Sequence, residues 1–214
     1  MKRHSIHQKA FSLVEILVVL AIMSILMGIG VKTMTGQGSQ EFSKGLSEVS
    51  GTLELSQTQA LSNRSTIRVL IGVDENDLVI LPLSFSQGGT PSDDESNDME
   101  NSKSWVPISK PVIVKNIKLN DEIVPPSDEI LLLSDSKTKS VTRKVSGKEV
   151  VFENMIQFSP SGEATLDNTG KAIRGIQWGM ETLGAKPKKA VIRVSGLTGR
   201  VQVLREEDLA KANP

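Results

Sequence analysis

One long apolar stretch near the N-terminus limits what this chain can fold into more than any other feature. It runs from Phe11 to Val31 and contains a single ionisable residue, Glu15. As an α-helix it would extend for about 30 Å, the thickness of the hydrocarbon core of a bilayer. The preceding residues 1–10 are basic, which favours retention of that end in the cytoplasm. The sequence therefore predicts one membrane-spanning helix over residues 11–31.

Two interpretations of this stretch rest on physical grounds alone. A secretory signal peptide has an apolar region of about 7–15 residues and a small-residue cleavage site, whereas this stretch is longer and no clear A-x-A site follows it. A plain membrane anchor explains the length but not Glu15, because a lone carboxylate in a spanning helix is costly and usually functional. Glu15 could also lie simply at the membrane interface, close to the start of the helix.

The run AFSLVEILVVLAI, from Ala10 to Ile22, closely resembles the prepilin signature of type IV pilins and type II secretion pseudopilins. The resemblance implies that a prepilin peptidase cuts between Ala10 and Phe11 and methylates the new amine of Phe11. It also implies a charge pair within a filament, between Glu15 and the Phe11 amine of a neighbouring subunit. Such a buried carboxylate is tolerable when a cation pairs with it. The family usually has glycine before the cut, where this chain has alanine.

The same resemblance implies partners and a location. The partners would be a prepilin peptidase, other pilin or pseudopilin subunits, the inner-membrane assembly platform and membrane lipid. The mature subunit would lie in the inner membrane through one span, with its C-terminal head extracytoplasmic, in the periplasm or at the cell surface after assembly. No cofactor and no metal are implied.

A second helical pattern follows the apolar stretch, over residues 32–62. Its apolar residues recur at helical spacing and define one face of an amphipathic helix. They are Phe42, Leu46, Val49, Leu53 and Ala60. Several glycines weaken this helix, and we expect bending or local melting around residues 28–38. A membrane anchor followed by an ordinary core helix would show the same stripe.

Short runs of branched apolar residues predict a small, mainly antiparallel β-sheet head over residues 63–205, and hence an α+β fold. The runs are 65–73, 77–83, 105–108, 111–119, 129–133, 150–158, 172–183, 189–195 and 200–204. The basic segment 134–148 is expected to be a loop or an exposed hairpin, and residues 206–214 form a tail. Two parts of the chain resemble the minor pseudopilin H and FimT-like group. One is the end of the helix with the strands that follow it, and the other is the C-terminal half with the runs IQFSPSGEAT and IRVSGLTGRVQVL. A looser resemblance is to the pilin-like cassette proteins called Verru_Chthon cassette protein D.

Residues 85–104 differ from the rest of the head because they are polar and acidic. The acidic residues are Asp93, Asp94, Glu95, Asp98 and Glu100. A calcium loop of the EF-hand type needs a glycine at its sixth position, and this segment lacks it. We therefore expect an exposed, solvated loop rather than a calcium site.

Catalysis is not expected of this chain. It contains no cysteine, and its two histidines, His4 and His7, lie in the leader that cleavage would remove. Histidine acid–base chemistry, thiolate nucleophiles and the usual zinc ligands would then be absent from the mature chain. The function expected is structural, in a type IV pilus-like filament or a type II secretion pseudopilus.

Nucleic-acid binding is the main alternative, because residues 186–205 carry six basic residues and no acid. The candidate DNA contacts are Lys188, Lys189, Arg193 and Arg200. FimT-like minor pilins of DNA uptake use a Gly-Arg-x-Arg pattern, whereas residues 199–202 read GRVQ and lack the second arginine, and an acidic run follows at 206–208. The sequence thus disfavours a DNA-binding minor pilin but leaves it open, together with a plain membrane-anchored interaction protein.

Overall fold

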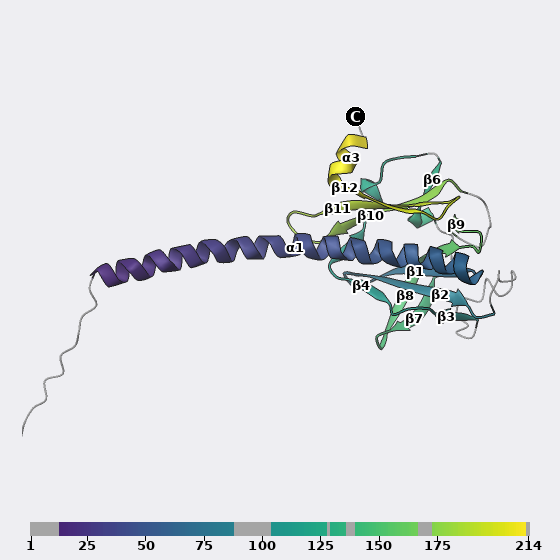
Figure 1. The fold of residues 1–214 in the computed structure, drawn as a ribbon, viewed down its shortest axis with the longest axis horizontal. Coiled ribbons are helices and arrows are strands. Elements are labelled where there is room, and N and C mark those ends of the chain that lie inside the picture. The colour runs from purple at the N-terminus through teal and green to yellow at the C-terminus, as the bar shows by residue number, and fades with distance from the viewer. Residues whose placement is uncertain (1–12, 88–103, 128, 136–139, 167–172, 213–214) are drawn as a thin grey trace, which may run out of the picture. The chain divides into compact units, whose positions relative to one another are not determined.

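The computed structural model describes residues 13–87, 104–127, 129–135, 140–166 and 173–212 of the 214-residue chain. Side chains are not described for residues 13, 15, 25–39 and 210–212. Two compact units are present, residues 1–41 and residues 42–214. The second unit contains both sheets and is called the head below (Figure 1).

The chain combines one long helix with short strands, which matches the predicted α+β class. The helices are α1 (Leu13–Asn63) and α3 (Glu206–Ala212), with short 3-10 turns η1 (Asp121–Ile123) and η2 (Leu133–Asp135). The strands are β1 (Ile67–Asp74), β2 (Asp77–Phe85), β3 (Trp105–Pro107), β4 (Val112–Val114), β5 (Ile117–Leu119), β6 (Ile130–Leu132), β7 (Val141–Val145), β8 (Lys148–Phe158), β9 (Ala164–Thr165), β10 (Gly175–Thr182), β11 (Lys189–Ser195) and β12 (Val201–Arg205).

The larger sheet has the strand order β3-β2-β1-β8-β7, with β4 on β2 and β9 on β8, and all its pairs are antiparallel. The smaller sheet has the order β12-β11-β10-β5 and is antiparallel except for β6, which runs parallel to β10. Within the head, Figure 1 shows residues 42–63 of α1 with β10, β11 and β12 on one side and β1, β2 and β8 on the other.

The predicted apolar stripe of α1 is buried and joins both sheets in one core cluster. Its five residues, Phe42, Leu46, Val49, Leu53 and Ala60, are all 6% exposed or less. Their cluster includes Ile67 and Val69 of the larger sheet and Trp178 and Ile192 of the smaller one. The stripe has helical spacing because only one face of α1 meets the sheets.

A second core lies on the other face of the larger sheet. Successive residues of a strand point to opposite faces, so Val69 belongs to the core shared with α1 while Leu70 belongs to the second cluster. Phe152 and Met155 of β8 both join this second cluster because the β1–β8 register shifts between Ile71 and Gly72. Both faces of this sheet are therefore apolar.

The structure differs from the sequence predictions at four places. The predicted strand 111–119 is wrong: β4 pairs with the larger sheet and β5 with the smaller one, because Asn116 between them adopts a left-handed φ of 55°. The Asn116 backbone N–H donates to Oδ1 of Asp77, which fixes the change of direction. The head has two sheets rather than one.

The other two differences concern the helices. The tail contains α3, whose first turn is acidic and whose start is capped by a hydrogen bond from the Arg205 backbone to Asp208. No melting of α1 occurs around residues 28–38, since helix continues throughout this stretch. Within the basic segment 134–148, residues 141–145 form β7, which pairs with β8 and buries Val141 and Val145.

Candidate functional sites

The residues predicted to be processed, Ala10 and Phe11, lie outside the described residues. In the sequence they precede α1, which begins at Leu13. Glu15 lies in the first turn of α1, and its side chain is outside the described part. The geometry of the Glu15–Phe11 pair therefore stays a prediction.

The helix surface around and after Glu15 is apolar and uncovered. Eight large apolar side chains are between 49% and 69% exposed. They are Val14, Ile16, Leu17, Val18, Val19, Leu20, Ile22 and Met23. A helix that is apolar on all sides is normally buried in a membrane or among other helices.

Among the described residues, no helix has an apolar segment of the length that crossing a membrane requires. The predicted span 11–31 extends beyond the described side chains at both of its ends.

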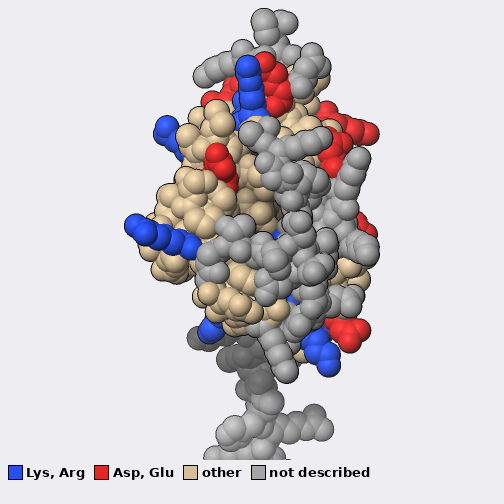
Figure 2. Space-filling model, turned by 90° about the vertical axis from the view of Figure 1, so that its right-hand side faces the viewer, with Lys and Arg blue, Asp and Glu red and all other residues tan. Residues whose placement is uncertain are grey.

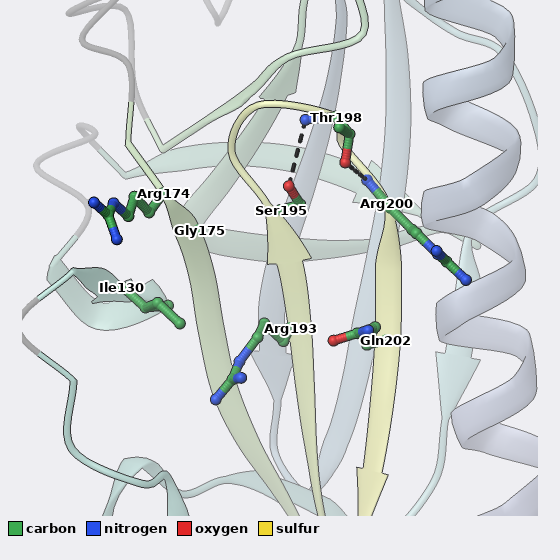
Figure 3. A pocket seen from close by; sticks show the side chains of 8 residues that line it. All are labelled: Ile130, Arg174, Gly175, Arg193, Ser195, Thr198, Arg200 and Gln202. Carbon is green, nitrogen blue, oxygen red and sulfur yellow. Dashed lines mark hydrogen bonds between the residues drawn. The ribbon is translucent and has the colours of Figure 1, made fainter.

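A polar cavity of about 270 Å³ lies on the smaller sheet, at the end where β11 turns into β12 (Figure 3). It is called the arginine pocket below. Its lining comes from β6, β10, β11, β12 and the turns beside them, and it consists of Ile130, Arg174, Gly175, Arg193, Ser195, Thr198, Arg200 and Gln202. Three arginines in one small cavity make it a candidate anion site, because guanidinium groups donate in a planar fork that matches oxyanions.

Strand register explains why these side chains meet. Arg193 of β11 is paired with Gln202 of β12, and Arg200 directly precedes β12 at the end of the turn. The turn between the strands is tight: Gly199 has a φ of 63°, and its N–H donates to the Ser195 carbonyl at 2.7 Å.

The same turn is tied to α1. The side-chain amide of Gln57 donates to the backbone carbonyl of Thr198. A side chain at Gly199 would also meet Gln57 and the Gly162 carbonyl, since a Cβ there would lie 2.5 Å from that oxygen. Glycine is therefore needed at position 199 both for the positive φ and for the close approach of three segments.

The guanidinium of Arg193 is hydrogen-bonded to a neutral side-chain amide rather than to a carboxylate. Its Nη2 donates to Oε1 of Gln177 at 3.1 Å, and Nε2 of Gln177 donates to the Pro125 carbonyl at 3.1 Å. Gln177 is only 1% exposed, so its orientation is fixed by these two bonds. Arg174, by contrast, forms an exposed ion pair with Glu129.

The four DNA contacts suggested by the sequence do not lie at one place. Arg193 and Arg200 line the arginine pocket. Lys189 begins β11 and Lys188 directly precedes it, so at the rise of a β-strand Lys189 lies about 13 Å from Arg193 and Lys188 lies farther away. Trp178 is fully buried in the core and is not available for base stacking. On the face shown in Figure 2, the visible Lys and Arg side chains among the described residues stand apart from one another, and Asp and Glu side chains are present on the same face.

Sequence reasoning missed Arg174 and Gln177 as members of this site. Arg174 directly precedes β10, and no motif marks it. Only the register of β10 against β11, which pairs Gln177 with Arg193, places these residues beside the C-terminal hairpin. That pairing follows from long-range packing and has no local sequence signal.

Glu181 forms a second polar cluster on the same sheet. It accepts a hydrogen bond from Nδ2 of Asn120 and lies 3.3 Å from Nζ of Lys118. The Asn120 hydrogen bond, with help from Lys118, holds the pKa of Glu181 below its ordinary value despite burial. Gly179 permits this arrangement, since a Cβ there would lie 1.9 Å from the Asn120 carbonyl oxygen.

Residues 6–31 match the family described as the prokaryotic N-terminal methylation motif. The match indicates a type IV pilin-like protein that is a substrate of a prepilin peptidase and that assembles with other pilins. It also points to anchoring in a membrane through the N-terminal segment. No curated protein and no solved structure matches the chain.

Proposed function

We propose that this chain is a non-enzymatic, structural subunit of a filament, a minor pilin or pseudopilin of the kind found in type IV pili and type II secretion systems. The observation that supports this function best is the uncovered apolar surface of α1 between Val14 and Met23. Each such side chain gains roughly 1.5–3 kcal/mol when it leaves water. The summed transfer free energy of eight such side chains would favour insertion of the helix into lipid before assembly and its packing against neighbouring helices afterwards.

The methylation motif supplies the second part of the proposal. Cleavage between Ala10 and Phe11 would remove the basic leader, and methylation would follow on the Phe11 amine. Glu15 would then be the only carboxylate in the apolar part of the helix. Within a bundle of such helices, its attraction to a Phe11 amine would be strengthened by the low dielectric, and it would set the stagger between subunits.

The location follows from the same features. The subunit would wait in the inner membrane with its head on the extracytoplasmic side, and the assembly platform would then draw it into the filament. Within this class we propose a subunit of the minor pseudopilin H and FimT-like kind. The basis is the order of the elements: a long helix, then strands, then a C-terminal Gly-Arg turn.

The mature N-terminus tests this function directly. The chain is expressed in membranes with and without an active prepilin peptidase, and its intact mass and N-terminal sequence are measured. We expect an N-terminus at Phe11, one methyl group heavier than the unmodified chain, only when the peptidase is present.

A matched pair of variants tests how far the residue before the cleavage site limits processing of the motif. Ala10→Gly carries the residue usual in this family and should be processed at least as fast as the natural chain, whereas Ala10→Glu should block processing. Intact Met1 in both the natural chain and Ala10→Gly, beside a peptidase that cuts a known pilin, would replace this proposal with a plain membrane anchor.

A further inference from the structure

We propose that the arginine pocket is an oxyanion site in the head that accepts carboxylates of an acidic peptide on a partner protein. This proposal rests on the described head residues and does not depend on assembly through α1. It starts from charge: three arginines line the cavity, and the only acid paired with one of them in the described part of the chain is Glu129, which contacts Arg174.

Arg193 is the buried half of the site. It is partly buried, and its hydrogen-bond partner Gln177 is neutral. Its Nε is fully buried and has no hydrogen-bond partner among the described residues. A cation that is withdrawn from water and bonded to a neutral amide gains strongly from an anion beside it, because the local dielectric is low.

Arg200 is the exposed half of the site. Its backbone N–H is bonded within the turn to Thr198, and among the described residues its guanidinium has neither a hydrogen bond nor an ion pair. Figure 3 shows Gln202 between Arg193 of β11 and Arg200, which directly precedes β12, with the two arginine side chains pointing away from each other. Hydroxyl groups of Ser195 and Thr198 add further donors to the lining.

The site is built before any ligand arrives. Gln177 and Pro125 fix Arg193, and the Gln57–Thr198 bond fixes the turn that carries Arg200. The Arg193 guanidinium, held in place before binding, does not have to lose side-chain freedom to the same extent as a free surface lysine. This feature separates the arginine pocket from an ordinary basic surface.

The dimensions favour single carboxylates over a nucleic-acid backbone. A phosphodiester chain needs a basic track along which successive phosphates lie, but Lys188 and Lys189 lie at the other end of β11. The segment after β12 is acidic at residues 206–208 and would repel a long polyanion. A cavity of about 270 Å³ accommodates one or two carboxylate groups of a peptide.

The test measures binding of a fluorescent synthetic peptide of alternating aspartate and serine to the full-length chain in neutral detergent micelles. The variants are Arg193→Gln and Arg200→Gln, and the matched control is Lys188→Gln, which removes the same charge outside the pocket. We expect each arginine variant to raise the Kd about tenfold or more, since a charged hydrogen bond is lost, and the control to leave it unchanged. A peptide of alternating asparagine and serine should not bind.

Three outcomes would overturn the proposal. Equal weakening by all three variants would mean that only net charge matters. Tighter binding of a single-stranded oligonucleotide than of the peptide, lost in the arginine variants, would make this a nucleic-acid site. Displacement of the peptide by an equal concentration of inorganic phosphate would make it a site for free phosphate. Arg200 is exposed, so Arg200→Gln keeps the test valid even if Arg193→Gln unfolds, as judged by tryptophan fluorescence.

Discussion

The guanidinium of Arg68 lies 4.1 Å from the centre of the Trp105 ring, and both side chains are completely buried. Nε of Arg68 also donates to Oε1 of Gln157 at 2.8 Å, and Trp105 packs against Phe85 with their ring centroids 5.5 Å apart. Burial lowers the pKa of Arg68 to about 10, so the side chain is still charged at neutral pH. The second core of the larger sheet thus contains a permanent cation.

The first prediction concerns this pair. Trp105→Ala should lower the free energy of unfolding by roughly 3–5 kcal/mol, because it leaves a large cavity, and roughly 0.5–2 kcal/mol of that loss should depend on Arg68. Urea unfolding of Trp105→Ala in the natural and Arg68→Met backgrounds measures the coupling. Trp178→Ala is the matched control, since Trp178 is equally buried in the other core. Equal losses for Trp105→Ala in both backgrounds would refute the coupling.

The second prediction compares two glycines of α1. At Gly51 a Cβ would meet nothing within 4 Å, whereas at Gly45 it would lie 2.3 Å from Cγ1 of Val114. Gly51→Ala should therefore stabilise the head by up to about 1 kcal/mol through helix propensity. Gly45→Ala should destabilise it, because β4 must move away from the helix.

Thermal unfolding of the two glycine variants distinguishes these effects. The double variant Gly45→Ala with Val114→Ala should recover part of the loss by making room for the new methyl group. A Gly45→Ala protein as stable as Gly51→Ala would mean that the close contact of α1 with β4 does not exist in solution.

The third prediction concerns pH. Because the hydrogen bond from Asn120 and the nearby Lys118 lower the pKa of Glu181 in the folded state, the unfolded chain binds this proton more readily. Glu181 therefore stabilises the head fully above its unfolded pKa of about 4.3, and this contribution is lost as the pH falls through the lower folded pKa. Glu181→Gln should be less stable than the natural chain at pH 7, and the difference should narrow toward pH 3.

Urea unfolding at several pH values between 3 and 7 measures this difference. The control is Glu129→Gln, which removes a carboxylate whose ion pair with Arg174 is exposed. Exposed pairs contribute about 0–1 kcal/mol, so this variant should stay close to the natural chain throughout. A difference in the free energy of unfolding between the natural chain and Glu181→Gln that does not change with pH would contradict a lowered pKa of Glu181 in the folded state.

The fourth prediction concerns assembly. Glu15→Leu should leave membrane insertion intact, since it makes the helix more apolar, but should strongly reduce recovery of the subunit in sheared filaments. Ser24→Ala is the control, because the Ser24 hydroxyl donates to the Leu20 carbonyl of its own helix and carries no charge. Normal recovery of Glu15→Leu in filaments would exclude the Glu15–Phe11 pair as the device that sets the stagger.

The local elements of this fold could be predicted from the sequence, because they depend on periodicity and turn residues. The stripe from Phe42 to Ala60 is buried as its spacing predicts, and Asp74–Asp77 close the β1–β2 hairpin. The arrangement of strands could not be predicted in the same way. The change of sheet at Asn116 depends on a left-handed residue and on Asp77, which lies far away in sequence.

The candidate site likewise contains some residues that the sequence could identify and others that it could not. Arg193 and Arg200 were found because they belong to one basic run of the sequence. Arg174 precedes β10 and lines the cavity, while Gln177 of β10 accepts a hydrogen bond from Arg193, and only the β10–β11 register places both beside the C-terminal hairpin. The same basic run contains Lys188 and Lys189, which do not line the cavity. Residues that are close in sequence lie far apart along an extended strand, so a basic run does not by itself define one site.

The stripe of α1 lies in one core cluster with residues of both sheets. It is made early in synthesis, whereas Val201 of the same core cluster belongs to β12. The core around the stripe is therefore complete only after the C-terminal hairpin has been made. Such late, long-range contacts slow folding and prolong the time during which apolar surface is exposed. A chain truncated before β12 would lack Val201 and would leave this core cluster incomplete.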